Sequence, residues 1–274
     1  MSTRPDDLAG PGGPRVAQRL AGRRLLVVGA GQQTYGMPDP PMGIGSAICE
    51  LASREGAVVA VADIDADAAQ VTVDRITRAG GVAHALQGDA SKPDDATRLV
   101  ENAAGLLGGL DALALNTGIA TGNRLDGTTP EDWDRTMAVN VRAHFLALRV
   151  ALDILVPGSA VTITSSTAAR AVTTSDLPAY ITSKAALDGL ARAAAKEYAA
   201  RRIRVNVVMP GLIDTSLGRL ASLIKPDRDT TPIPLGRQGT AWDVAEAHVF
   251  LLSHAAAYIT GITLPVDGGL VSIH

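Results

Sequence analysis

The sequence predicts a single α/β domain built on a doubly wound, seven-stranded parallel sheet with helices on both faces. Two observations lead to this prediction. Short runs rich in Val, Leu and Ile alternate with segments of helical periodicity, which is typical of successive β-α-β units. The runs also lack strict polar alternation, as expected for strands that are buried on both faces. No repeat or linker divides the chain after residue 20.

The expected elements follow one another along the whole chain. Seven strands are expected at 23–29, 57–63, 82–88, 111–117, 159–165, 203–210 and 262–268. Helices are expected between them, among others at 43–55, 65–79, 92–108, 130–156, 178–200 and 241–253. Right-handed crossovers would place these helices on both faces of the sheet. Residues 1–20, rich in Pro, Gly and charge, are expected to form a flexible tail before a domain of residues 21–274.

Composition excludes several classes of function. A net charge of −3 gives no electrostatic reason to expect nucleic acid or an anionic membrane as a partner. The single Cys49 cannot form an internal disulfide, and the histidines show no metal-ligand spacing, so no metal site is expected. The N-terminus lacks the apolar stretch of a signal peptide, and the longest apolar run is interrupted by Arg149 and Asp153. We therefore expect a cytoplasmic protein.

A glycine cluster follows the first strand and resembles a dinucleotide-binding loop. The candidates are Gly29, Gly31, Gly43 and Gly45, with Ile44 inside the "GIG" that opens a helix. Glycine permits a tight turn, a close backbone approach to pyrophosphate and close packing of helix on strand. The N-terminal amides of the helix would face the phosphates. Glycine clusters are also common in ordinary turns, so this signal alone is weak.

The second strand ends at Asp63, eighteen residues after Gly45. A carboxylate there can accept both hydroxyls of the adenosine ribose, and it would repel the 2′-phosphate of NADP. NAD is therefore the expected cofactor. Ile64 follows Asp63 and is counted among the cofactor-binding candidates. A helix N-cap is the alternative role for a carboxylate here, but it suits Asp65 better.

Tyr180 and Lys184 are four residues apart in an expected helix and therefore share one face. A buried lysine ammonium beside a phenol lowers the pKa of the phenol by favouring phenolate. Such a tyrosine can act as a general acid or base near neutral pH. An isolated Y-x-x-x-K pair is otherwise most often an exposed helix face.

The sequence resembles the short-chain dehydrogenase/reductase family, in its classical single-domain form, over about residues 22–270. The motifs occur in the order of the family: the glycine loop, "GDA" with Asp89, "NTG" (116–118), "MAVN" ending at Asn140, "ITSS" ending at Ser166, Y-x-x-x-K and "MPGLIDT" (209–215). The resemblance implies a Rossmann-like fold and an NAD(H)-dependent oxidoreductase acting on a secondary alcohol or ketone. The middle residue of "NTG" is threonine, where the family more often has alanine.

The resemblance also implies a role for each matching residue. Tyr180 would exchange the substrate hydroxyl proton, Ser166 would hold the substrate oxygen, and Lys184 would bind the nicotinamide ribose and keep the pKa of Tyr180 low. Asn140 would bend its helix and hold a water that connects Lys184 to solvent. The remaining cofactor contacts would come from Asp89 and Ala90 at the adenine, Asn116 and Gly118 at the adenosine side, and Pro210, Gly211, Ile213 and Thr215 near the carboxamide.

The serine assignment is the least secure of these. Ser166 lies fourteen residues before Tyr180, one more than is usual in the family, and Ser165 and Thr167 are hydroxyl-bearing neighbours.

Residues 32–41 form an insertion of ten residues in the glycine loop, relative to the family's G-x-x-x-G-x-G. A surface insertion is tolerated because loop-closure entropy rises by only about 0.6 kcal/mol per doubling of length. Its three prolines stiffen it. Three roles are open: an excursion into solvent, a contact with another subunit, or a cover over the pyrophosphate. The last predicts slow NAD release.

The segment 212–239 is expected to be a mobile loop that selects the substrate, together with the loop before Tyr180. Its basic residues Arg219, Lys225 and Arg228 could meet an anionic group, although exposed loop charge is the simpler interpretation. Two other functions are considered: a 3-oxoacyl-thioester reductase-like enzyme, and a non-catalytic NAD-binding regulatory protein. By analogy with the family, the long helices at 130–156 and 178–200 imply a homotetramer, with a dimer as the alternative.

Overall fold

The computed structural model describes residues 18–170, 176–224, 228 and 230–273. Within them, seven parallel strands form one sheet in the order β3-β2-β1-β4-β5-β6-β9. The strands are β1 (Arg24–Val28), β2 (Val58–Asp63), β3 (Ala83–Gln87), β4 (Ala112–Leu115), β5 (Ala160–Thr164), β6 (Arg204–Pro210) and β9 (Thr263–Val266). Each lies inside a strand expected from sequence, so the doubly wound parallel sheet is confirmed.

Eight α-helices occur in the described part of the chain. They are α1 (Ile44–Arg54), α2 (Ala66–Arg78), α3 (Pro93–Leu107), α4 (Pro130–Met137), α5 (Ala143–Ile154), α6 (Pro178–Tyr198), α7 (Ser216–Ile224) and α8 (Ala241–Leu252). Several begin at strong local signals. The Asp65 carboxylate accepts hydrogen bonds from the first turn of α2, and reciprocal capping boxes start α4 at Thr129 and α8 at Thr240.

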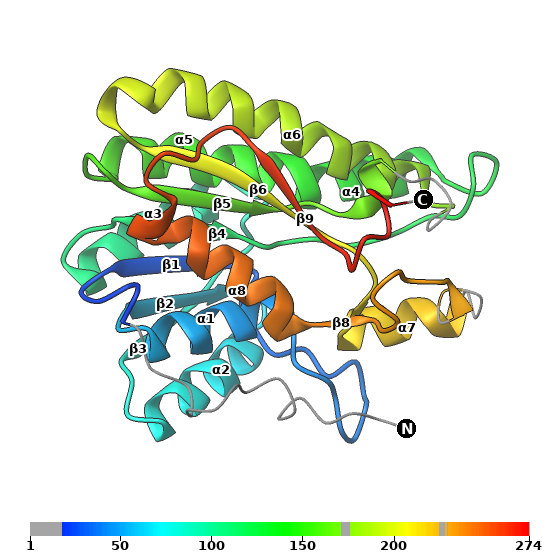
Figure 1. Ribbon diagram of the computed structural model, residues 1–274, viewed down its shortest axis with the longest axis horizontal. Helices are drawn as coiled ribbons and strands as arrows, with labels where there is room; N and C mark the ends of the chain where they lie inside the picture. The colour runs from blue at the N-terminus through cyan, green and yellow to red at the C-terminus, as the bar shows by residue number, and fades with distance from the viewer. Residues whose placement is uncertain (1–17, 171–175, 225–227, 229, 274) are drawn as a thin grey trace.

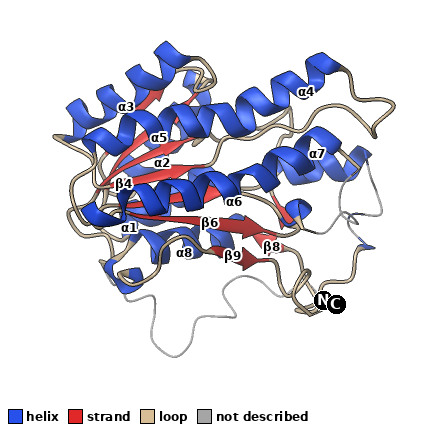
Figure 2. Cartoon of the chain, turned by 90° about the horizontal axis from the view of Figure 1, so that it is seen from above, coloured by secondary structure: helices blue, strands red, loops and turns tan. Residues whose placement is uncertain are grey.

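The helices cover the sheet in two layers (Figures 1 and 2). In Figure 1, α5 and α6 lie above the sheet, and α1, α2 and α8 lie below it. One apolar core joins the sheet to α3, α5 and α6 through residues such as Leu99, Leu148 and Leu187. A second joins it to α1, α2 and α8 through residues such as Ile48 and Val249. Burial on both faces explains why the central strands lack polar alternation.

One expectation about the elements is wrong. The segment 212–239 is not simply a loop, because it contains α7, whose residues Leu217 and Leu220 recur at helical spacing. The segment is also fixed at both ends by a short parallel pairing of β7 (Ile213–Asp214) with β8 (Gly239–Thr240). The expected helix 130–156 is found as a continuous helical run over Pro130–Ile154, in which a π-helical turn (Ala138–Arg142) lies between α4 and α5.

The expected boundary between tail and domain at residue 20 is also placed too late. Leu20 is fully buried in the second core, and Arg19 forms an ion pair of 2.8 Å with Glu55 at the end of α1. The domain therefore includes these residues. The rest of the expected tail, residues 1–17, lies outside the described residues.

Candidate active site

The carboxyl ends of the parallel strands bring most of the predicted site residues to one edge of the sheet. Asp63 ends β2 and Pro210 ends β6. Asn116 directly follows β4, and Ser166 is the second residue after β5. The chain also leaves β1 at this edge to form the glycine loop. Because ligands bind in open α/β sheets at this edge, the fold places the candidates where a nucleotide site is expected.

The glycine loop is packed so closely that side chains are excluded at three of its four glycines. A Cβ on Gly29 would lie 2.8 Å from the Thr117 amide nitrogen, and one on Gly45 would overlap the Gly29 carbonyl oxygen. A Cβ on Gly31 would lie 2.8 Å from the carboxyl carbon of Asp63, whose Oδ2 accepts the Gly31 amide at 2.8 Å. Gly43 has more room, with no other atom within 3.6 Å of a Cβ. This cradle fits the close backbone approach that a pyrophosphate requires.

Gly45→Ala is expected to weaken both the fold and nucleotide binding, because the new methyl group would force α1 away from β1. Overpacking of this kind costs about 1–3 kcal/mol of stability. Gly105→Ala in α3 is the matched control, since a Cβ there meets nothing within 4 Å and alanine favours the helix. Thermal unfolding and a dinucleotide titration would test both variants. Equal stability and equal binding for the two would contradict this packing.

Beneath the glycine loop, a buried chain of hydrogen bonds reaches through the sheet. Asn116 donates to the Gly29 carbonyl at 2.9 Å and accepts from the Thr164 hydroxyl at 2.9 Å. Thr164 Oγ1 lies 3.3 Å from Nε2 of His248, and Nδ1 of His248 lies 2.8 Å from the Thr162 hydroxyl. Since Thr164 donates its only proton to Asn116, His248 must carry its proton on Nε2. Burial lowers the pKa of His248 to about 3, so the ring is neutral.

His248 could not be recognised from the sequence. A lone histidine in a largely apolar helix carries no local signal, and only the fold brings α8 against β5.

Tyr180 and Lys184 lie together in the first turns of α6. Nζ of Lys184 is 5.8 Å from the centre of the Tyr180 ring and donates a hydrogen bond of 3.1 Å to the Thr164 carbonyl. The lysine is only 3 % exposed. Burial lowers its pKa to about 8, because the ammonium loses hydration that the protein replaces only in part.

The pKa of Tyr180 is shifted in the opposite direction to the one expected. Burial raises it, while a hydrogen bond with Ser166 and the charge of Arg228 lower it by less. The lysine does not produce the expected lowering, because its ammonium is bound to the Thr164 carbonyl on β5 and not to the phenol oxygen. The phenol is therefore protonated near neutral pH in this structure.

The structure distinguishes Ser166 from its two hydroxyl-bearing neighbours. The Ser166 side chain hydrogen-bonds Tyr180 and also accepts from the Ala168 amide at 3.2 Å. Ser165 is buried and donates to the Lys184 backbone carbonyl at 2.9 Å, which joins β5 to α6. Thr167 is 1 % exposed. Of the three, only Ser166 has its hydroxyl at the phenol.

Asn140 lies in the π-helical turn (Ala138–Arg142), where the helix departs from regular α-geometry. Its Oδ1 accepts the Ile119 amide at 2.8 Å, and its Nδ2 donates to the Ile119 carbonyl at 2.8 Å and to the Ser183 hydroxyl at 2.9 Å. The side chain therefore ties the segment after β4 to α6, close to Lys184. Its expected water-binding role stays a prediction.

Gly118 lies beside Lys184. A Cβ there would be 3.0 Å from Nζ of Lys184, and the expected contact of Gly118 at the adenosine side stays a prediction. Gly118 has this place because β4 lies next to β5, and the chain after Asn116 runs towards α6.

The other adenosine-side candidates follow β2 and β3. Ile64 is 62 % exposed beside Asp63, where its surface is available to a ligand. Asp89 accepts hydrogen bonds from the Ser91 amide at 3.0 Å and the Ser91 hydroxyl at 2.7 Å, and Ala90 is buried behind it. Asp89 thus shapes the turn after β3.

The carboxamide candidates Pro210, Gly211, Ile213 and Thr215 follow in order from the end of β6. A Cβ on Gly211 would lie 2.7 Å from the Asp267 backbone, so glycine is needed there. The Thr215 hydroxyl accepts the Gly218 amide at 3.0 Å at the start of α7.

Two of the basic residues in segment 212–239 have defined partners. Arg219 forms an ion pair with Asp214 at 2.7 and 2.9 Å. Arg228 donates to the Ile213 carbonyl at 3.2 Å, and its charge lowers the pKa of Tyr180. The interpretation of Arg228 as exposed loop charge is therefore wrong. Lys225 lies outside the described residues.

In the described part of the chain, no cluster of three or more His, Cys, Asp or Glu side chains could hold a metal ion. No described helix combines the length and the apolar character needed to cross a membrane.

Comparison with known proteins gives one consistent family. The family model described as enoyl-(acyl carrier protein) reductase matches residues 41–271. 2-(S)-hydroxypropyl-CoM dehydrogenase 3 of Xanthobacter autotrophicus is 36 % identical over 265 residues, which cover 94 % of this chain and all of the relative. Cyclohexanol dehydrogenase of an Acinetobacter species is 33 % identical over 262 residues, covering 94 % of this chain and 98 % of the relative.

A solved structure shows the same fold. A short chain dehydrogenase from Burkholderia cenocepacia in complex with NADP superposes with a TM-score of 0.83 at 34 % identity, covering 92 % of this chain and 99 % of that one.

Proposed function

Because the chain belongs to the short-chain dehydrogenase/reductase family, we propose that it transfers a hydride between NAD and a secondary alcohol or ketone. One observation carries this proposal. The Tyr180 phenol is hydrogen-bonded to Ser166, with the buried nitrogen of Lys184 5.8 Å from its ring centre. A proton donor and acceptor, a hydroxyl for the substrate oxygen and a nearby cation are thereby assembled at the ligand-binding edge of the sheet.

In the proposed reaction, Tyr180 holds and moves the proton. During alcohol oxidation its oxygen accepts the proton of the substrate hydroxyl, and during reduction it returns one to the carbonyl oxygen. Ser166 donates a hydrogen bond to the same oxygen, which stabilises negative charge as it develops. The charge of Arg228 favours phenolate, and Asn140 fixes the backbone beside Lys184. The nicotinamide, when bound, supplies the hydride acceptor or donor.

The glycine cradle is the part of the chain that fits the cofactor. Gly29, Gly31 and Gly45 admit no side chain, which lets the loop, β2 and the start of α1 pack closely together at this edge of the sheet. Asp63 lies at the adenosine end, where its Oδ2 already accepts the Gly31 amide. We assign the remaining cofactor contacts to the residues predicted from sequence.

We propose NAD as the preferred cofactor because of the charge on Asp63. The related structure holds NADP, so the preference needs a direct test. Asp63→Asn is expected to weaken NAD binding about tenfold, because a charge-assisted hydrogen bond is lost, and to narrow the difference between NAD and NADP. Asp65→Asn is the matched control, since asparagine also caps helices well. Dissociation constants for both cofactors would be measured by calorimetry. An unchanged ratio in the Asp63 variant would contradict the proposal.

The substrate proposed is a secondary alcohol or its ketone. The relatives named for hydroxypropyl-CoM and cyclohexanol support this class. The description of the matching family model favours a second candidate, a ketone or enoyl group carried on a thioester. A panel of secondary alcohols and 3-hydroxyacyl thioesters, assayed with NAD and with NADP by absorbance at 340 nm, distinguishes the two. Cofactor binding without turnover of any substrate would instead favour a non-catalytic regulatory protein.

We also propose a cytoplasmic homotetramer. Trp133 on α4 and Phe145 on α5 are 38 % and 47 % exposed, which supports a protein interface on these helices. Light scattering on the purified protein tests the assembly, and a monomer at micromolar concentration would contradict it.

A further inference from the structure

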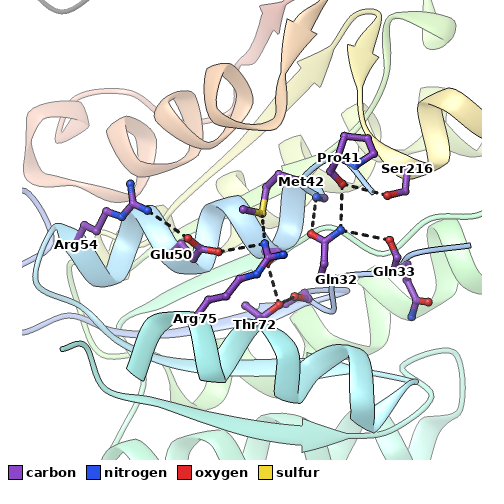
Figure 3. A network of polar contacts seen from close by, with 12 residues as sticks. Gln32, Gln33, Pro41, Met42, Glu50, Arg54, Thr72, Arg75 and Ser216 are labelled. Carbon is purple, nitrogen blue, oxygen red and sulfur yellow. Dashed lines mark hydrogen bonds and ion pairs between the residues drawn. The ribbon is translucent and has the colours of Figure 1, made fainter. Parts of the chain in front are cut away.

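Residues 32–41, called the strap below, are closed at their base by one buried side chain. Gln32 is 3 % exposed, and all of its amide is used (Figure 3). Its Oε1 accepts the Gly43 amide at 2.9 Å, and its Nε2 donates to the Pro41 carbonyl at 3.0 Å and the Gln33 carbonyl at 3.3 Å. The two ends of the strap are therefore held together, and α1 begins as it would after a short loop.

The Pro41 carbonyl also joins the strap to α7. It accepts a second hydrogen bond, of 3.1 Å, from the hydroxyl of Ser216, the first residue of that helix. Figure 3 shows this carbonyl between the Gln32 amide and the Ser216 hydroxyl. Ser216 is 3 % exposed, so water competes little for this contact. The contact spans 175 residues of sequence and connects the glycine loop with the segment that carries Ile213 and Thr215.

The charges of Asp39 in the strap and Arg219 on α7 also support the contact between these two segments. The pKa of Arg219 on α7 is raised, first by its hydrogen-bonded pair with Asp214 and further by the charge of Asp39 in the strap. Beside Gln32, Gln33 donates to the carboxylate of Asp65, the N-cap of α2, at 3.3 Å. The strap thus contacts both the start of α2 and the start of α7.

The chain just after the strap is anchored to rigid elements. Arg75 on α2 donates to the Met42 sulfur at 3.2 Å and pairs with Glu50 on α1 at 3.6 Å (Figure 3). This end is fixed on α1 and α2, and the base is closed by Gln32. Loss of the Ser216 hydrogen bond would therefore leave the hydrogen bonds of the glycine loop in place.

We propose that the strap ties the glycine loop to α7 through the Pro41 carbonyl, so that the bound dinucleotide is retained until the Ser216–Pro41 contact opens. Gln32 and Ser216 are then positioning residues. They touch neither substrate nor hydride, but they hold the segment Ile213 to Thr215 in place against the rest of the site. This inference rests on the proposed function, because the retained ligand is the nicotinamide cofactor.

The test is the dissociation rate of NADH from the intact protein, followed by fluorescence in a stopped-flow displacement with excess NAD. Ser216→Ala removes the hydrogen bond to the Pro41 carbonyl. The NADH dissociation rate is expected to rise about three- to tenfold. Gln32→Ala should raise the NADH dissociation rate as much or more, because it removes the hydrogen bonds of the Gln32 amide to the Pro41 and Gln33 carbonyls. Thr34→Ala is the matched control, because the Thr34 hydroxyl binds only the Gly36 amide within the strap.

The possible results separate the two proposals. Faster release in the Ser216 and Gln32 variants, with release from the Thr34 variant at the wild-type rate and thermal unfolding of Ser216→Ala unchanged, supports the strap. Wild-type release from Ser216→Ala overturns it and leaves the proposed oxidoreductase function intact. If the wild-type protein binds neither NADH nor NADPH, both proposals fall. If it binds NADPH only, the same variants are tested with NADPH.

Discussion

Replacement of Tyr180 by phenylalanine is expected to lower kcat at least about a hundredfold while NAD still binds, because general acid-base catalysis contributes factors of this size or more. The change removes only the hydroxyl, so the ring beside Lys184 and the packing of α6 remain. The rate would be measured by NADH absorbance and NAD affinity by titration.

Tyr198→Phe is the matched control for this prediction. Tyr198 lies at the other end of α6 and packs against the core, far along the helix from Ser166. This variant should keep wild-type turnover. Activity that survives in Tyr180→Phe, or that falls as far in Tyr198→Phe, would contradict the acid-base role.

Lys184→Met is expected to abolish most activity. It is also expected to change how the free energy of unfolding depends on pH. Burial lowers the pKa of Lys184 from its ordinary 10.5 to about 8, so the folded protein binds this proton more weakly than the unfolded chain does. The wild-type fold is therefore destabilised as pH falls from 10.5 through 8, by about 3 kcal/mol in total. Above pH 10.5 the group is neutral in both states and the effect vanishes.

The free energy of unfolding of Lys184→Met, relative to wild type, should accordingly rise by up to about 3 kcal/mol between pH 11 and pH 7. Constant effects, such as loss of the hydrogen bond to the Thr164 carbonyl, cancel in this pH difference. Urea unfolding at several pH values measures it. Lys196→Met, on the exposed face of α6, controls for the loss of one positive charge. A difference in stability that does not vary with pH would contradict the buried, weakly basic lysine.

Much of the fold follows from local patterns in the sequence. The runs around β1, β2, β4, β5 and β6 are largely apolar and lack strict polar alternation because both faces of these strands are buried, and such runs are visible without any structure. The spacing of Tyr180 and Lys184 likewise follows from the geometry of one helix. The strong caps at Asp65, Thr129 and Thr240 mark helix starts in the same local way.

The features of the site that could not be predicted from the sequence depend on contacts between distant segments. The Lys184 ammonium binds a carbonyl of β5, and this tertiary contact decides the direction of the Tyr180 pKa shift. Arg228 reaches Tyr180 only because α7 turns the chain back towards the site. The helix α7 itself was obscured by the prolines and glycines around it, although its leucines have helical spacing.

The glycine loop shows the same limit. Sequence comparison with the family identifies the extra ten residues, but not that Gln32 would close them at their base or that Ser216 would contact Pro41. A glutamine has no sequence signature for bridging backbone groups nine and eleven residues away.

Hydride transfer from a secondary alcohol to the nicotinamide cofactor is tested most directly by following a labelled hydrogen. The wild-type protein would be incubated with NAD and with secondary alcohols carrying deuterium on the carbinol carbon, and the recovered cofactor would be examined by NMR. Deuterium is expected at C4 of the nicotinamide ring, delivered to one face. Oxidised alcohol without deuterium on the cofactor, or no labelled cofactor from any alcohol or 3-hydroxyacyl thioester tested, would contradict hydride transfer.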